Sequence, residues 1–111
     1  MFRMSLNRVH DTVRISEGSE SITLRVDADA GRMVAGISQA AKGLQALTDK
    51  SPDEDQKKGA LYFASVIFGE EQAQRLLEFY HDDAWCVINL CGQYLDKRLK
   101  KLIAKAQKKS K

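Results

Sequence analysis

The chain has 111 residues, of which 43% are hydrophobic and 30% are charged, and its net charge is +3. These values are those of an ordinary globular protein and exclude a wholly disordered chain. A chain of this length forms one domain with a thin core, which argues against a large enzyme with a deep pocket. One proline and seven glycines are too few turn formers for a fold of many strands. No apolar run approaches the roughly 18 residues that a membrane span needs.

The charge is distributed unevenly along the chain. Residues 97–111 carry eight of the 18 basic residues and no acidic residue. The first 96 residues hold the other ten basic residues and all 15 acidic residues, so their net charge is −5. An acidic body with a basic end indicates an interaction element at the C-terminal end.

Alternation of polar and apolar residues over 12–16 and over 21–26 predicts two strands. Residues 17–20, Glu-Gly-Ser-Glu, have the composition of a tight turn in which Gly18 takes a positive φ. The apolar residues on one face of this ribbon are Val13, Ile15, Ile22, Leu24 and Val26. Because an isolated two-stranded ribbon is marginal in water, it must lie on helices or pair an edge with another chain.

Apolar residues recur at helical spacing from residue 29 to residue 48, behind Asp27 and Asp29, either of which suits an N-cap. The stripe consists of Ala30, Met33, Val34, Ile37, Ala40, Ala41, Leu44 and Leu47. Gly36 and Gly43 lie seven residues apart on one line of this helix, where they would allow another element to approach closely.

The sequence Ser51-Pro52-Asp53-Glu54 is typical of a helix N-terminus and predicts a second helix. Ser51 would be the cap and Glu54 would complete a reciprocal capping box. This helix is expected to run to Phe68, where Gly69 ends it, and a short third helix is expected over 70–80.

One last helix is expected over 84–106, after a break at residues 81–83 in which Asp83 is the N-cap. Its apolar stripe continues into the basic segment, so the lysines there would lie on the exposed side of an amphipathic helix. The stripe consists of Ala84, Val87, Ile88, Cys91, Tyr94, Leu95, Leu99, Leu102, Ile103 and Ala106.

These elements predict a mostly α fold of about four helices with a short N-terminal β-hairpin, an α-rich member of the α+β class. Residues 1–11 would be a flexible N-terminus, residues 12–106 a single domain and residues 107–111 a frayed basic tail. The core is expected to hold Leu44, Leu47, Ile67, Phe68, Leu76, Leu77, Trp85, Ile88 and Leu95.

Catalytic and metal-binding motifs are missing from the sequence: it has no Gly-rich phosphate loop, no nucleophile elbow and no Cys/His cluster. His81-Asp82-Asp83 favours capping and solvation, because adjacent residues in a helix break rarely converge on one ion. Cys86 and Cys91 are five residues apart, about 140° around a helix, which predicts reduced, buried cysteines and a reducing cytoplasm. Neither an enzymatic activity nor a cofactor is expected.

Residues 67–80 have the sequence IFGEEQAQRLLEFY, and Tyr94-x-x-x-Arg98 follows in an apolar helix that ends in lysines. Together with the preceding strand pair and two helices, this order over residues 12–109 resembles the small tail assembly chaperones of long-tailed bacteriophages and prophages. The chain differs from that family in its very regular 29–48 helix and in lacking a strongly acidic final segment. The resemblance implies a non-catalytic protein of the bacterial host cytoplasm, absent from the finished virion. It would bind the helical tape measure protein, with the tail tube protein as a second candidate partner, and assist tube assembly.

Residues 94–109 are expected to form an arm that docks on the partner. Burying a leucine contributes roughly 1.5–3 kcal/mol, against at most about 1 kcal/mol for an exposed ion pair, so apolar contact should dominate. The apolar residues of the arm are Leu95, Leu99, Leu102 and Ile103. The basic residues, which would supply mainly solubility and steering, are Lys97, Lys100, Lys101 and Lys105.

Two other functions stay open. The basic helix could bind nucleic acid without sequence specificity, with an affinity that falls steeply with salt. The ribbon, with Arg14 and Arg25 on its outer face, could instead enter a DNA groove in a small dimeric regulator, although the acidic residues around it argue against this. Self-association is expected in any case, because both the ribbon edge and the terminal helix would be exposed. No membrane partner is expected.

Overall fold

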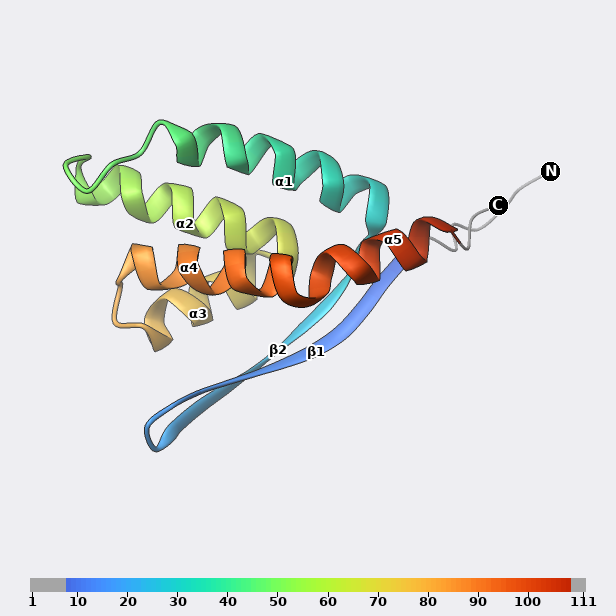
Figure 1. Ribbon diagram of the computed structural model, residues 1–111. Coiled ribbons are helices and arrows are strands. Elements are labelled where there is room, and N and C mark those ends of the chain that lie inside the picture. The colour runs from blue at the N-terminus through green and yellow to red at the C-terminus, as the bar shows by residue number, and fades with distance from the viewer. Residues whose placement is uncertain (1–7, 109–111) are drawn as a thin grey trace.

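The structure, a computed structural model, describes residues 8–108 and shows a two-stranded antiparallel ribbon followed by a helical bundle (Figure 1). The predicted α-rich α+β fold is confirmed. The elements are β1 (Arg8–Glu17), β2 (Glu20–Asp29), α1 (Ala30–Gln45), α2 (Asp53–Phe68), α3 (Glu70–Phe79), α4 (Ala84–Tyr94), the π-helical segment η1 (Leu95–Leu99) and α5 (Lys100–Lys108).

The ribbon is longer than the alternation of residue types predicted. Its strands pair from Arg8 opposite Asp29 to Glu17 opposite Glu20, so residues 8–11 are strand and the flexible N-terminus predicted for 1–11 is wrong there. The remaining residues, 1–7, lie outside the described part of the chain. The added length is held by polar contacts, such as the Arg8 ion pair with Asp27 at 2.9 Å, which an apolar pattern does not reveal. Gly18 has φ +61°, as the predicted turn requires.

One face of the ribbon packs against the helices and the other faces outward. The inner face buries Val9, Ile15, Ile22, Leu24 and Val26, while the predicted Val13 is half-buried. β2 contacts α1, α2 and α3, and β1 contacts α5. The marginal ribbon is thus stabilised by burial against its own helices.

Helix α2 is the centre of the bundle, because it contacts α1, α3 and α4 as well as β2. In Figure 1, α1 and α2 run antiparallel, and α4 lies along α2 with α3 beside it. Of the predicted core, Ile67, Phe68, Leu76 and Leu77 are buried. The other predicted core residues are only half-buried, namely Leu44, Leu47, Trp85, Ile88 and Leu95. The full burial in α4 belongs to Val87 and Cys91 instead.

Most predicted helix ends are confirmed. Asp29 caps α1 by accepting a hydrogen bond from the Arg32 amide at 3.0 Å, and Asp83 caps α4 by accepting one from the Cys86 amide at 3.3 Å. Gly69 ends α2 with φ +89°. Helix α1 ends at Gln45, three residues before the predicted end.

The capping box predicted at the start of α2 is wrong. Pro52 occupies the N-cap position, and no side chain caps the helix there. The Ser51 hydroxyl accepts a hydrogen bond from the Thr48 amide at 3.0 Å, so it serves the preceding loop. The loop is held instead by Gln56, whose amide nitrogen donates to the carbonyl of Ser51 at 2.7 Å and whose oxygen accepts from the Trp85 indole at 2.8 Å.

The last helix is continuous from Ala84 to Lys108, but it is not regular. Residues 95–99 form a π-helical turn, and the Lys100 amide bonds to the Leu95 carbonyl. Gln107 and Lys108 are helical, so the frayed tail predicted for 107–111 does not begin at 107. Residues 109–111 lie outside the described range.

The prediction of close helix approach is correct at Gly36 and wrong at Gly43. A Cβ atom at Gly36 would lie 2.7 Å from Val66 Cγ1 of α2, whereas a Cβ at Gly43 would meet nothing within 4 Å. Within α1, the close approach to α2 is therefore at Gly36, near the middle of the helix. The seven-residue spacing placed both glycines on one line of the helix, so it could not distinguish which of them contacts α2.

Candidate functional site

The C-terminal helix, predicted as a free docking arm, packs on its own chain. Helix α5 contacts α1 and β1, and Leu99 and Ile103 are buried with 0% and 7% of their surface exposed. The prediction that these two residues are available to a partner is therefore wrong in this conformation. Leu95 and Leu102 are half-buried. Periodicity indicated the apolar side of the helix, but the bundle itself covers most of that side.

A buried carboxylate ties this helix to the first strand. Asp11 lies on the inner face of β1 with 6% of its side chain exposed, and Arg98 donates to it from Nε at 2.5 Å and from Nη2 at 2.8 Å. The Tyr94 hydroxyl donates to the same carboxylate at 2.7 Å. The Arg98 hydrogen bond lowers the pKa of Asp11, whereas burial and the Asp11 hydrogen bond raise the pKa of Tyr94. Asp11 is thus ionised and satisfied, which fixes the position of α5.

Between α1 and α5 runs a shallow groove with an apolar floor, here named the α1/α5 groove. Its volume is about 310 Å³. It is lined by Val34, Ile37, Ser38, Leu95, Lys100, Ile103, Ala104 and Gln107. Val34 is 42% exposed, one of the two large hydrophobic side chains exposed to this degree in residues 8–108. An apolar groove of this kind suits the apolar side chains of a partner helix.

The structure brings only part of the predicted site into this groove. Leu95, Ile103 and Lys100 line it, while Leu99 lies beneath the surface. The α1 contribution was missed, because Val34 and Ile37 were placed on the apolar stripe of that helix but not on a binding surface. The width of the apolar stripe could have indicated this, because the stripe is wider than the surface that a single neighbouring element can cover.

The basic residues of the arm are exposed around α5. Lys97, Lys100, Lys101 and Lys105 all face solvent. Lys100 pairs with Asp96 of the preceding turn at 3.1 Å. No carboxylate within residues 8–108 forms an ion pair with the other three lysines. The exposed side of α5, beside the α1/α5 groove, is thus strongly basic.

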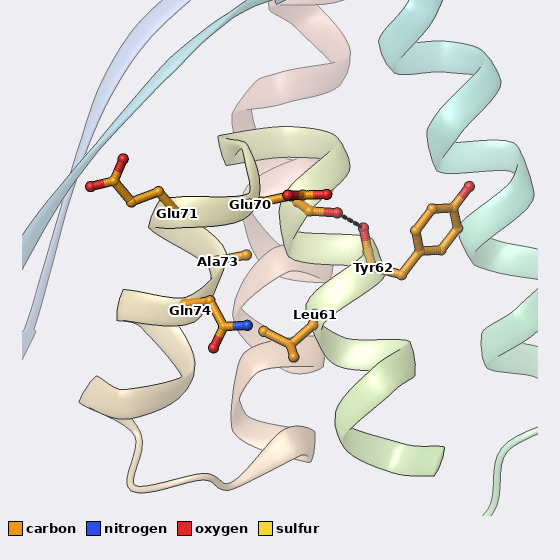
Figure 2. Close-up of a pocket in the computed structure, with 7 residues that line it drawn as sticks. Leu61, Tyr62, Glu70, Glu71, Ala73 and Gln74 are labelled. Carbon is orange, nitrogen blue, oxygen red and sulfur yellow. Dashed lines mark hydrogen bonds between the residues drawn. The ribbon is translucent and has the colours of Figure 1, made fainter. Parts of the chain in front are cut away.

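A second hollow lies on the surface between α2 and α3 and is here named the α2/α3 cleft (Figure 2). It has a volume of about 660 Å³ and is lined by Leu61, Tyr62, Ser65, Glu70, Glu71, Ala73 and Gln74. Figure 2 shows Leu61 and Gln74 pointing towards each other, whereas the Tyr62 ring is turned towards α1. Ser65 donates its hydroxyl to the Tyr62 carbonyl at 2.8 Å. The cleft therefore has an apolar floor with acidic residues at one end.

The other residues considered for catalysis or metal binding lie in the turn at 81–83 and on helix α4. His81 and Asp82 form a tight turn with φ of 55° and 65°. No group of three His, Cys, Asp or Glu side chains in residues 8–108 could hold a metal ion. Cys86 and Cys91 are free, and burial raises the pKa of Cys91 to about 12. Within the same residues, no helix is both long and apolar enough to cross a bilayer.

No family model matches the chain, and no similar protein is found among curated proteins or solved structures. Its function is therefore inferred from the surfaces described above.

Proposed function

We propose that this protein is a non-catalytic assembly factor that binds an amphipathic helix of its partner in the α1/α5 groove. The observation that carries the proposal is the exposure of Val34, at 42%, beside Ile37 and Ala104 in an apolar groove between two helices. A partner helix would place apolar residues there at i, i+3 or i+4, and i+7. Burying a side chain the size of Val or Leu contributes roughly 1.5–3 kcal/mol.

Charge defines which helix would suit this groove. Lys100 lies on its rim, and Lys101 and Lys105 are exposed on the same helix. A partner helix with acidic residues beside its apolar stripe therefore has complementary charge. Such surface charges accelerate and orient association more than they add to affinity.

The partner we propose is the tape measure protein of a long-tailed phage or prophage, with the tail tube protein as the second candidate. The order of elements predicted over residues 12–109 and the sequence Phe68-Gly69-Glu70-Glu71 support this assignment by resemblance. A long helical protein with exposed apolar stripes would aggregate in the bacterial cytoplasm before the tail is built. A chaperone that binds these stripes would prevent this. The chaperone would then be absent from the finished virion.

Co-expression with the tape measure protein tests this proposal. Val34→Asp places a charge in the groove, and Gln39→Asp places the same charge on an exposed position of α1 that does not line it. We expect the wild type and the Gln39→Asp variant to keep the tape measure protein soluble, whereas Val34→Asp leaves it in the insoluble fraction. Equal protection by all three proteins would contradict the groove assignment.

A neutralised variant, Lys100→Gln with Lys101→Gln and Lys105→Gln, tests nucleic-acid binding by the basic helix. We expect this variant still to protect the tape measure protein, because the apolar floor of the groove is intact. Salt-sensitive binding of wild type to random duplex DNA that the neutralised variant loses, together with no effect of Val34→Asp on solubility, would favour the nucleic-acid function.

A further inference from the structure

Helix α3 carries an exposed acidic line beside the α2/α3 cleft. Glu70, Gln74 and Glu78 lie four residues apart and are all exposed, and we name them the glutamate stripe. Neither glutamate forms an ion pair with a basic residue in the described part of the chain. The positive end of the helix dipole explains why an acidic residue, Glu70, lies at the start of α3. It does not explain Glu78, which lies at the opposite end of the helix.

Helix α5 and the turn before it carry a basic line with the same period. Lys97, Lys101 and Lys105 are exposed, four residues apart, and lack a described carboxylate partner; we name them the lysine stripe. This stripe is separate from the lining of the α1/α5 groove, to which α5 contributes Lys100, Ile103, Ala104 and Gln107. Docking through the lysine stripe therefore leaves the groove lining itself in place.

We propose that the lysine stripe of one copy of this chain docks on the glutamate stripe and the α2/α3 cleft of a second copy. Glu70 and Glu78 are eight residues apart, about 12 Å along α3, with the neutral Gln74 between them. The lysines recur every four residues, so alternate lysines match the spacing of the two glutamates. Rows of this period also form the ridges by which two helices commonly interlock. Leu61 on the floor of the cleft offers an apolar contact for the methylene stems of the lysines.

The contact must form between copies. Figure 1 shows α5 and α3 in separate parts of the molecule, so the two stripes do not meet within one chain. Because the two surfaces differ, the association is head-to-tail and extends into a row or closes into a ring. Lys101 and Lys105 also contribute to the charge beside the α1/α5 groove, but no residue of either stripe lines that groove, and Val34→Asp leaves both stripes intact. The failure of this contact is therefore distinguishable from the failure of the helix-binding function.

Charge reversal with rescue tests the proposal. The first variant carries Lys101→Glu and Lys105→Glu, and the second carries Glu70→Lys and Glu78→Lys. Each variant alone opposes like charges at the contact, but a mixture of the two restores opposite charges at both interfaces between alternating copies. Sedimentation velocity over a concentration series at about 0.05 M salt measures the association, and circular dichroism confirms that each variant is folded.

We expect the wild type to sediment faster as its concentration rises, each variant to associate at least about tenfold more weakly, and the mixture to regain association. A control variant with Lys42→Glu and Lys50→Glu has the same net charge as the first variant and should behave as the wild type. If Glu70→Lys disturbs the start of α3, the milder Lys101→Gln with Lys105→Gln variant should still lose association. A wild type that stays monomeric, or folded variants that associate as it does, or a mixture without rescue, would overturn the proposal.

Discussion

Arg98 holds both carboxylate oxygens of Asp11, at 2.5 Å and 2.8 Å, although the two residues are 87 positions apart in the chain. The contact joins the π-helical turn before α5 to the first strand, and Tyr94 completes it from one turn earlier. The two ends of the domain are thereby fixed to each other. The terminal helix is a packed element for this reason, even though its exposed side is strongly basic.

Asp11→Asn should lower the free energy of unfolding by about 1–3 kcal/mol at neutral pH, because a charged hydrogen-bonded group is lost. The pKa of Asp11 is lowered below its ordinary value of 3.8, so its stabilisation is present above that pH and is lost as the pH falls through the lowered pKa. Urea unfolding should therefore show the difference between wild type and variant shrinking below about pH 4. Asp96→Asn, which removes an exposed ion pair with Lys100, is the control and should change little.

Gln56→Glu should destabilise the protein although it keeps the shape of the side chain. The Gln56 amide nitrogen donates to the carbonyls of Thr48, Asp49 and Ser51, and a carboxylate cannot donate to any of them. We expect a loss of about 1–3 kcal/mol in urea unfolding, because acceptors in a partly buried site lose their donor. Gln45→Glu, at an exposed position of α1, should have almost no effect.

Gly36→Ala and Gly43→Ala should change stability in opposite directions. A methyl group at Gly36 would lie 2.7 Å from Val66 Cγ1, and a β-branched side chain cannot easily turn away. We expect a loss of about 1–3 kcal/mol from overpacking. At Gly43 the space is open, so alanine should stabilise α1 by up to about 1 kcal/mol. Thermal unfolding of the two variants beside wild type measures both effects, and equal shifts would contradict this helix packing.

Cys91 should resist thiol reagents in the folded protein. It is fully buried, and burial raises its pKa to about 12, so almost no thiolate exists at about pH 8. Cys86 is half-buried, and burial also raises its pKa, so it should react slowly. Labelling followed by peptide mass spectrometry should find modification at Cys86 first and at Cys91 only with denaturant. Early modification of Cys91 would show that α4 opens readily.

The sequence by itself determined the elements and most of their ends. Alternation predicted the ribbon, and the i, i+3, i+4 spacing predicted the helices, because each pattern follows from the geometry of one element. Gly69 and Asp83 were identified correctly as end signals, and the cap of α1 was narrowed to Asp27 or Asp29, because each signal acts on the backbone within a few residues. The basic character of the terminal helix was likewise evident from composition alone.

Only the tertiary structure decided which apolar surface each helix leaves open. Leu99 and Val34 both fit an apolar stripe, yet Leu99 is fully buried and Val34 is 42% exposed, because burial depends on the neighbouring element as well as on the residue. The Asp11–Arg98 contact joins residues 87 positions apart, and the Gln56–Trp85 hydrogen bond joins residues 29 positions apart, so no local sequence pattern predicts either. For the same reason, the sequence predicted a free C-terminal arm as the binding site, whereas the structure has a groove between α1 and α5. The apolar stripe shows which side of a helix is apolar, but tertiary packing determines which element covers that side.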